Sequence, residues 1–406
     1  MRRFFFIVLA LAVSFTAFAR IPESGWHFYY AESAMRLGLM KVVGRSEAEP
    51  KKYGYDASGY VRMDWGGSYI QLAYQGKALS LRLGCMLDTE PQYNWYNIWF
   101  DSSMDAQPDT IIRLAEQDCL LIFDGRVYND QESVPDLFES SAYKTCSASA
   151  CHQVIIQKRT EAEHGIFHIG LIAVDGLLLP LQPDKTRLIE FIGDSYSTGY
   201  GIENCGPADH FTPETQNPSK TYAAILARYF DADYITLAHS GMGVIRNYNS
   251  KFPGWTMPLR YRMTFDMDSV LYPWVAAEHD IHPSLTVIML GGNDFSCGVT
   301  PDFEEFKKGY WDLLLQIKAN YGADYPILCV TKPLPALSDY VRRVVEESGM
   351  TDVCYFANSE AVWQMNETDL GADRHPNYNA HRKLAHTLIP YVSTITGWEL
   401  TGKPIE

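Results

Sequence analysis

The stretch Leu188-Ile-Glu-Phe-Ile-Gly-Asp-Ser-Tyr-Ser-Thr-Gly-Tyr-Gly201 decides how the rest of the chain is interpreted. Its apolar and β-branched residues predict a buried strand that ends at Gly193, so Asp194 and Ser195 stand where the chain leaves the strand. A serine at the carboxyl end of a central strand, with glycines nearby to admit a ligand, suits a nucleophile. By itself, a strand followed by a polar turn is the simpler interpretation. The decision therefore depends on residues far downstream.

A serine nucleophile needs a base, and Asp373-Arg374-His375-Pro376 near the C-terminus offers one. An imidazole in such a loop can reach a serine, while a carboxylate behind it fixes the tautomer and stabilises the imidazolium. Ser195, His375 and Asp373 are therefore the candidate catalytic residues. Some enzymes with this arrangement use a backbone carbonyl in place of the acid, so a small role for Asp373 stays open. Asp194 is expected to be a structural turn residue.

Donors for an oxyanion are available at the ends of two further predicted strands. Asn293 follows the strand at 285–290 and offers its side-chain amide, and Gly241 follows the strand at 234–238 and offers its N–H. The N–H of Ser195 is the third donor. Each block is a weak signal alone, but four blocks in this order, three of them directly after strands, indicate acyl-transfer chemistry.

Beyond a proline-containing linker at 179–184, strands and helical patterns alternate. Five strands with crossover helices predict a parallel, doubly wound sheet with helices on both faces. Ligands bind outside the carboxyl ends of the strands in such sheets, where the candidate residues fall. The predicted strands are 188–192, 234–238, 285–290, 327–331 and 353–356, and the last helix is 378–392.

The region from about Trp26 to Leu179 reads mostly as short strands. Residues 69–74 and 78–83 alternate apolar and polar side chains around Gln75-Gly76-Lys77, which predicts a hairpin. Many short strands with few helical stretches argue for a β-sandwich. Such a domain serves as a carbohydrate-binding module or as a structural partner, and we favour the structural role because the pattern establishes no exposed aromatic row.

The four blocks resemble those of the SGNH, or GDSL-type, hydrolases: Gly193-Asp194-Ser195, Gly241, Gly291-x-Asn293-Asp294 and Asp373-x-His375. Residues 158–162 and 240–247 are similar to carbohydrate esterase family 2. The resemblance implies an N-terminal jelly-roll-like β-sandwich and a C-terminal, flavodoxin-like, three-layer α/β domain with a five-stranded parallel sheet. It also implies removal of acetyl groups from plant polysaccharides of the xylan or mannan type. Arg374 departs from the pattern, because members often carry an aromatic residue there.

Three functions fit these residues. The first is an acetylesterase that acts on carbohydrate through a Ser-His(-Asp) mechanism. The second is a lipase or thioesterase of the same fold, and the third is a carbohydrate-binding protein with an inactive hydrolase domain. Few long apolar stretches and the attached sandwich favour the first over the second. The intact serine, histidine and asparagine argue against the third.

The first 19 residues have the parts of a secretory signal peptide: a basic start, a short apolar core and small residues before a cut after Ala19. The apolar run is shorter than the ~20 residues that a membrane span needs. We therefore expect a secreted or periplasmic protein with a signal peptide at 1–19, a β-sandwich domain at 20–180 and a hydrolase domain at 186–406.

The chain of 406 residues carries a formal net charge of −15. Such an acidic protein has no electrostatic reason to bind nucleic acid or an anionic membrane surface, so a neutral acetylated carbohydrate is the expected partner. No cofactor is expected. The eight cysteines lack the paired C-x-x-C spacing of zinc sites, so no metal is expected either. The oligomeric state stays open.

Three further sets of residues allow more than one interpretation. The cysteines of an exported chain form disulfides or stay free, and Cys205 and Cys297 each follow a catalytic block. Three histidines are expected to be packed or solvated: His164, His168 and His239. An aromatic group either stacks on sugars or packs the core: Tyr248, Phe252, Trp255, Tyr261, Tyr272 and Trp274.

Overall fold

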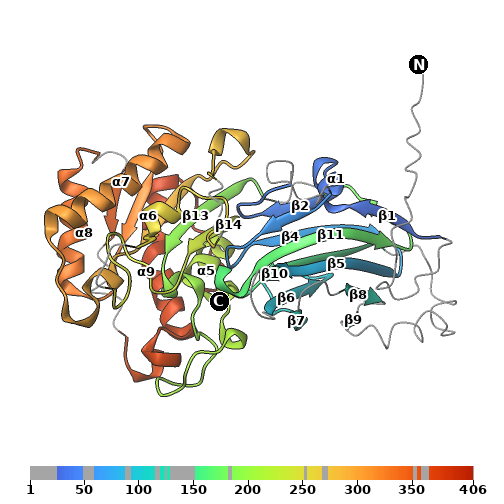
Figure 1. The fold of residues 1–406 in the computed structure, drawn as a ribbon, viewed down its shortest axis with the longest axis horizontal. Coiled ribbons are helices and arrows are strands. Elements are labelled where there is room, and N and C mark those ends of the chain that lie inside the picture. Colours follow the sequence, from blue (N-terminus) through green and yellow to red (C-terminus); the bar gives the residue numbers. More distant parts are fainter. Residues whose placement is uncertain are drawn as a thin grey trace.

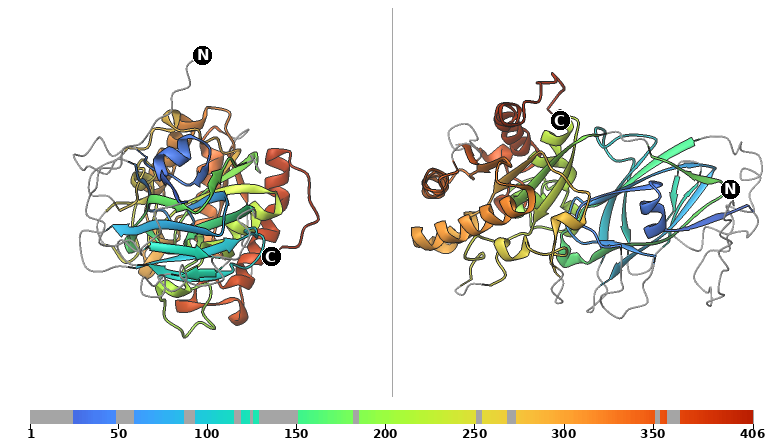
Figure 2. Two further views of the ribbon diagram at one scale, coloured as in Figure 1. Left: turned by 90° about the vertical axis from the view of Figure 1, so that its right-hand side faces the viewer. Right: turned by 90° about the horizontal axis from the view of Figure 1, so that it is seen from above.

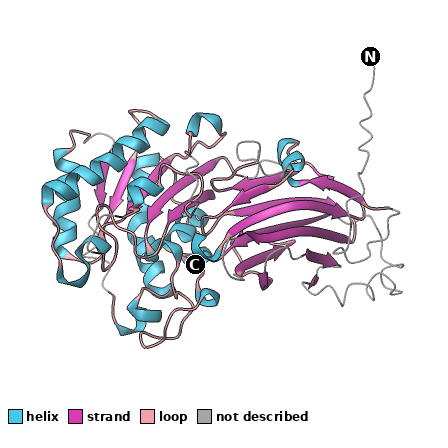
Figure 3. Ribbon diagram, in the orientation of Figure 1, coloured by secondary structure: helices cyan, strands magenta, loops and turns pink. Residues whose placement is uncertain are grey.

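The structure is a computed structural model that describes residues 25–405, except for 49–58, 87–92, 115–118, 124–125, 129–150, 182–184, 251–253, 268–272, 351–353 and 358–364. The proposed signal peptide, Phe252 and Tyr272 therefore lie outside the described residues. Figure 1 shows two bodies placed end to end, one from each half of the chain. Most of the helices belong to the C-terminal body (Figure 3).

Two antiparallel sheets of six strands form the N-terminal body, which is a β-sandwich as predicted. One sheet has the order β1-β11-β5-β8-β9 with β3 on β11, and the other has the order β12-β4-β10-β6-β7 with β2 on β4. Alternate apolar side chains of both sheets fill one interior. The jelly-roll connectivity stays a prediction. The elements are β1 (His27–Tyr30), α1 (Ala31–Arg36), β2 (Met40–Val43), β3 (Val61–Met63), β4 (Tyr69–Gln75), β5 (Ala78–Met86), β6 (Asn94–Phe100), β7 (Thr110–Leu114), β8 (Cys119–Phe123), β9 (Arg126–Tyr128), β10 (Cys151–Lys158), β11 (Ile166–Val174) and β12 (Leu177–Leu179).

The predicted hairpin between β4 and β5 is wrong, because the two strands belong to different sheets. The chain crosses from one sheet to the other at Gly76, and β11 and β12 cross back beside it at Asp175-Gly176. The Asp175 carboxylate accepts the N–H groups of Lys77 (2.8 Å) and Ala78 (3.0 Å), which fixes the two crossings together. A two-residue alternation looks the same for a hairpin and for strands that face each other across a core.

A parallel five-stranded sheet is the centre of the C-terminal body, as predicted. Its order is β14-β13-β15-β16-β17, which in chain order is 2-1-3-4-5, the flavodoxin-like doubly wound arrangement. Both ladders of β13 are parallel and in unbroken register. The strands are β13 (Arg187–Gly193), β14 (Ala232–Ala238), β15 (Leu285–Met289), β16 (Ile327–Val330) and β17 (Cys354–Ala357).

Helices cover both faces of this sheet and complete three layers. Phe191 and Val287 point to the face where α5 (Tyr222–Tyr229) and α9 (Tyr378–Thr396) pack. Their neighbours along the strands point to the other face, where the core includes α7 (Phe303–Tyr321) and α8 (Pro335–Glu347). The shorter helices are α4 (Ser195–Thr198), η2 (Ala162–His164), η3 (Pro213–Thr215), η4 (Pro218–Lys220), α6 (Met257–Arg260), η5 (Ala276–Glu278), η6 (Gly292–Gly298), η7 (Glu367–Asp369) and η8 (Ala372–Arg374).

The sandwich lies directly against the α/β body, as the right-hand view of Figure 2 also shows. One apolar cluster contains Trp65 and Trp99 from the sandwich together with Ile235 and Leu237 from β14. Arg45 of the sandwich is almost fully buried, and it donates to the carbonyl oxygen of Met263 at 2.9 Å. The junction is therefore a continuous core with buried charge rather than a loose linker contact.

Candidate active site

The candidate residues gather at the carboxyl edge of the parallel sheet, because three of the four blocks directly follow strands. Ser195 follows β13 and opens α4, Gly241 lies three residues after β14, and Asn293 lies in η6 after β15. Figure 1 shows β13 and β14 side by side at the middle of the molecule. This edge is where open parallel sheets bind their ligands.

The structure brings Ser195 and His375 together across 180 residues of sequence. His375 Nε2 lies 2.9 Å from Ser195 Oγ, a hydrogen-bond distance for a nucleophile and its base. Burial lowers the pKa of His375, and the positive charge of Lys332 lowers it further. Asp194 and the backbone of Asp373 and Ala372 act in the opposite direction. A lowered pKa keeps the imidazole neutral near pH 7, so it can accept a proton.

The Asp373 carboxylate is directed away from the imidazole. It lies 2.9 Å from His210 Nδ1, and it accepts from Tyr200 Oη and the N–H of Phe211 at 3.1 Å each. Within the described parts of the chain, no hydrogen bond joins this carboxylate to His375. Asp373 and Arg374 both have positive φ angles, 49° and 62°, and this left-handed turn carries the carboxylate outward. The His210 contact lowers the pKa of Asp373, which keeps it charged.

Two of the three predicted oxyanion donors are backbone groups. Among the hydrogen bonds of the described residues, none uses the N–H of Ser195 or Gly241. Gly241 has φ +79°, a conformation that favours glycine, and its carbonyl accepts the N–H of Tyr248 at 2.7 Å. The Asn293 amide already donates to the Met242 carbonyl (2.8 Å) and to Asp194 (3.1 Å). Both of its hydrogens are therefore engaged in this structure.

Asp194 joins the ends of three strands and is fully buried. Its carboxylate accepts the N–H of Tyr196 at 3.2 Å, the Asn293 amide, and Lys332 Nζ at 2.7 Å. Lys332 also lies 4.0 Å from the centre of the Tyr196 ring. Lys332 was not among the residues expected from the sequence, although a polar residue directly after the predicted strand 327–331 is a usable signal. Asp194 is the structural residue that was expected, but it is also a charge close to the base.

Asp294 connects two of the sequence blocks. It accepts three successive N–H groups, those of Val244, Ile245 and Arg246, at 2.8–2.9 Å. Burial raises the pKa of Asp294 to about 6, although these hydrogen bonds act to lower it. The segment that follows Gly241 is thus held by a carboxylate that follows Asn293 in the sequence, so the second and third blocks form one unit.

Four of the six aromatic residues that were expected to stack on sugars or pack the core are described, and they divide into an exposed pair and a buried pair. Tyr248 and Trp255 are exposed, whereas Tyr261 and Trp274 are buried at the domain junction beside Arg45. Nearer the serine, the Tyr200 ring lies 4.3 Å from the His375 ring. Two of the predicted rings are therefore exposed, and the base itself packs against Tyr200, which was not among the residues expected from the sequence.

The remaining histidines and cysteines have ordinary surroundings. His168 lies edge-on to Tyr60 at 4.2 Å, and His239 pairs with buried Asp266. Cys205 and Cys297 are both free and exposed, so they do not form a disulfide with each other. The described parts of the chain contain no group of three or more histidine, cysteine or acidic residues able to hold a metal ion. No described helix is both long enough and apolar enough to cross a bilayer.

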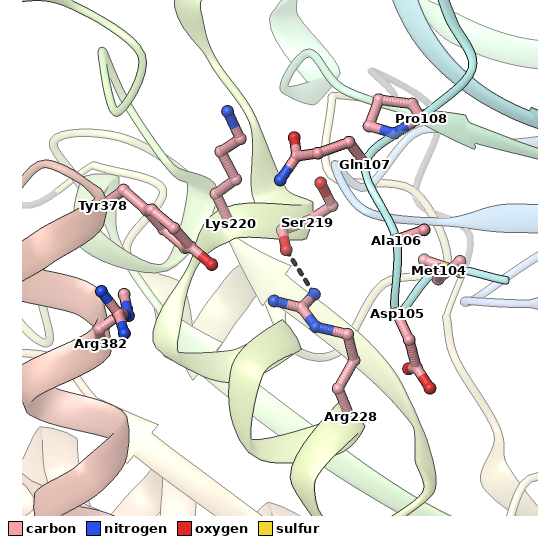
Figure 4. A pocket seen from close by; sticks show the side chains of 10 residues that line it. All are labelled: Met104, Asp105, Ala106, Gln107, Pro108, Ser219, Lys220, Arg228, Tyr378 and Arg382. Atoms are coloured by element: carbon pink, nitrogen blue, oxygen red, sulfur yellow. Dashed lines mark hydrogen bonds between the residues drawn. The ribbon is translucent and has the colours of Figure 1, made fainter. Parts of the chain in front are cut away.

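A hollow of about 330 Å³ lies between the loop that follows β6 and the α5 and α9 helices (Figure 4). Its three cationic side chains are already engaged: Lys220 with Glu203, Arg228 with the Ser219 carbonyl, and Arg382 with the Ile405 carbonyl. None of the candidate catalytic residues lines it.

A serine–imidazole pair with backbone donors, at the carboxyl edge of a 2-1-3-4-5 parallel sheet, defines the SGNH or GDSL-type class of hydrolases. Residues 191–383 match the GDSL-like Lipase/Acylhydrolase family. The C-terminal body therefore contains a GDSL-like domain, and the predicted resemblance to carbohydrate esterase family 2 is confirmed by the relatives of the chain.

Two relatives are similar in sequence over much of the chain. The chain is 32% identical over 258 residues to the cellulase/esterase CelE of Acetivibrio thermocellus, covering 62% of this chain and 31% of that protein. It is also 32% identical over 244 residues to an acetylxylan esterase / glucomannan deacetylase of Cellvibrio japonicus, covering 57% of this chain and 62% of that protein. The chain thus spans less than two thirds of the length of either relative.

Two solved structures share both bodies of the fold. A family two carbohydrate esterase from Clostridium thermocellum, in complex with cellohexaose, aligns over 89% of this chain and 100% of its own. The TM-score is 0.72 and the identity 25%. A family two carbohydrate esterase from Cellvibrio japonicus covers 92% of this chain and 98% of its own, with a TM-score of 0.74 at 21% identity. The second likeness shows the fold alone.

Proposed function

We propose that the chain is an exported serine esterase that removes O-acetyl groups from plant polysaccharides or oligosaccharides of the xylan or mannan type. The observation that carries the proposal is the 2.9 Å contact between His375 Nε2 and Ser195 Oγ at the carboxyl edge of the sheet. The substrate class is supported by the acetylxylan esterase / glucomannan deacetylase relative and by the cellohexaose bound to a similar structure. Export rests on the first 19 residues.

The mechanism follows from the positions of the side chains. Ser195 Oγ attacks the ester carbonyl and gives its proton to His375 Nε2, and the oxyanion accepts the N–H groups of Ser195 and Gly241. Asn293 joins as the third donor when substrate displaces one of its present acceptors. His375 then protonates the sugar oxygen of the tetrahedral intermediate. The sugar departs as an alcohol, and Ser195 remains acetylated. Water attacks this ester with His375 as base, and acetate leaves as the serine is restored.

The position of His375 is proposed to depend on the backbone of its own loop. The backbone of Asp373 and Ala372 acts to raise the pKa of the imidazole, although Nδ1 makes no hydrogen bond to any described residue, and the Asp373 carboxylate holds the loop against His210 and Tyr200. The pair Ser195–His375 therefore carries the chemistry, and Asp373 supports it from behind.

The test is hydrolysis by the full chain and its Ser195→Ala variant. Wild type should release p-nitrophenol from p-nitrophenyl acetate and acetate from acetylated xylan or mannan, and Ser195→Ala should release neither. Ser102→Ala in the sandwich, whose hydroxyl bonds Asp109, serves as the control and should keep full turnover. Undiminished turnover by Ser195→Ala would refute the assignment. An optimum at long acyl chains would replace the acetylesterase with a lipase or thioesterase.

A further inference from the structure

Glu161 brings a carboxylate from the sandwich side of the molecule to the edge of the site. It lies between β10 and η2, and its side chain is almost fully buried. Its carboxylate accepts both the N–H and the hydroxyl of Ser240 at 2.5 Å each, one on each oxygen. Gln216 Nε2 donates a third hydrogen bond at 2.7 Å.

The segment that carries Glu161 is itself fixed. Lys158 Nζ donates to the carbonyls of Thr160 (2.6 Å) and Glu161 (2.7 Å), and the Thr160 hydroxyl donates to Asn94 at 2.7 Å. The Glu161 N–H donates to the Gln216 side chain at 3.1 Å. A carboxylate on such a support holds its partner in one orientation, because a two-oxygen contact fixes direction as well as distance.

Ser240 is the residue directly before Gly241, so the Glu161 contact acts on the peptide that aims an oxyanion donor. The far side of the same turn is held within the α/β body, by the Tyr248 N–H on the Gly241 carbonyl and by Asn293 on the Met242 carbonyl. The near side is held by Glu161. The turn is thus fixed between the two bodies of the protein.

We propose that Glu161 is a positioning residue for ester hydrolysis, which sets the direction of the Gly241 N–H through Ser240. The inference rests on the proposed esterase function and on Gly241 as an oxyanion donor. It assigns the sandwich side of the junction a part in the reaction. Displacement of a reacting group or its donors by about 1 Å can cost ~10²-fold in rate, so a small shift of this turn is enough to matter.

Asp233 is a matched control at the same junction. It lies on β14, the strand that leads to Ser240, but seven residues earlier at the amino end. It also joins the two bodies, since it accepts from Tyr69 Oη at 2.5 Å and pairs with Lys41 Nζ at 2.7 Å. Loss of either carboxylate weakens the junction, but only Glu161 touches the turn.

The experiment compares Glu161→Gln with Asp233→Asn in the full chain. For p-nitrophenyl acetate, Glu161→Gln should lower kcat by ~10- to 100-fold with KM within about twofold, because the lost interaction acts in the transition state. Binding of phenylboronic acid, whose serine adduct places an oxygen in the oxyanion position, should weaken by a similar factor. Asp233→Asn should keep kcat within about twofold at a comparable melting temperature. Unchanged kcat in Glu161→Gln, or an equal loss in Asp233→Asn, overturns the inference.

Ser240→Ala covers the case in which Glu161→Gln does not fold. It removes the hydroxyl contacts with Glu161 and with Thr198 Oγ1 (3.3 Å) and leaves the backbone contact with Glu161, so kcat and boronate affinity should fall together by ~3- to 10-fold. Full activity with full boronate affinity in this variant overturns the inference. An active wild type with unaffected variants contradicts this inference alone, whereas an inactive wild type contradicts the proposed function and this inference with it.

Discussion

The nucleophile turn and the histidine loop meet at the site, but they are held in different ways. The turn at Asp194-Ser195 is buried, and its carboxylate binds Tyr196, Asn293 and Lys332 from three strand ends. The loop at Asp373–His375 lies at the surface, and its carboxylate binds Tyr200, the N–H of Phe211 and the exposed His210.

This difference indicates how the side chains of Ser195 and His375 are each held in position. Buried, charge-assisted hydrogen bonds position the serine, so a change there leaves unpaired groups without water to replace the lost partner. Exposed hydrogen bonds support the histidine, and water can substitute for them. The same chemical change, aspartate to asparagine, should therefore have a large effect in the turn and a small one in the loop.

Asp194→Asn should have the largest effect. The amide cannot balance the charge of Lys332, whose side chain is mostly buried, and its NH₂ group meets the Asn293 amide or Lys332. We expect a loss of about 3 kcal/mol in the free energy of unfolding, by analogy with other broken buried pairs. We also expect a fall in kcat of ~10²-fold as the serine turn shifts. Urea unfolding and steady-state kinetics measure both.

The control for this variant is Asp302→Asn. Asp302 is the N-cap of α7, as Asp194 is of α4, and it accepts the Glu305 N–H at 3.0 Å from an exposed position. It should change stability by less than about 1 kcal/mol and leave kcat unchanged. Equal losses in the two variants would show that the buried position of Asp194 does not matter.

Lys332→Met should have an intermediate effect, visible in the pH profile. The reaction needs neutral His375, so kcat/KM of the wild type falls on acidification through a pKa that lies below the usual value for histidine. Burial is the main cause of that low pKa and the Lys332 charge is the next. Removal of the charge should raise the pKa and move the acid limb to higher pH. A limb that stays in place or moves to lower pH contradicts this electrostatic account.

Asp373→Asn should have the smallest effect, a fall in kcat of less than about fivefold. Replacing the aspartate of a buried triad costs ~10⁴-fold, because there the carboxylate fixes the imidazole tautomer. Here the carboxylate binds His210 and Tyr200 instead, so His210→Ala should match Asp373→Asn. A loss of ~10³-fold or more in Asp373→Asn alone would show that the carboxylate turns toward His375 during the reaction.

The sequence predicts much of this arrangement, because the relevant signals are local. Each strand of the parallel sheet is a short apolar run, and each block follows the end of a strand or lies shortly before the last helix. Their convergence then follows from the topology of a doubly wound sheet. The parallel sheet and the sandwich could thus be predicted, and the proximity of Ser195 to His375 agrees with the expectation.

Features that depend on long-range contacts could not be predicted. The β4–β5 crossing has the same alternation as a hairpin, and only the distant Asp175 distinguishes them. The direction of Asp373 depends on two left-handed residues, neither of which is glycine. The roles of Glu161 and Lys332 depend on their contacts with Ser240 and Asp194, which lie 79 and 138 residues away in the sequence.

The shared apolar cluster at the junction has a consequence for how the molecule loses its structure. Trp65 and Trp99 pack in the same core as Ile235 and Leu237. Separation of the two bodies would therefore expose apolar surface of both to water. We therefore expect that cleavage of the linker does not give two independently stable domains, because each would expose an apolar surface. On heating, the protein should therefore unfold in one cooperative step. The β-sandwich should unfold at the same temperature at which hydrolytic activity is lost.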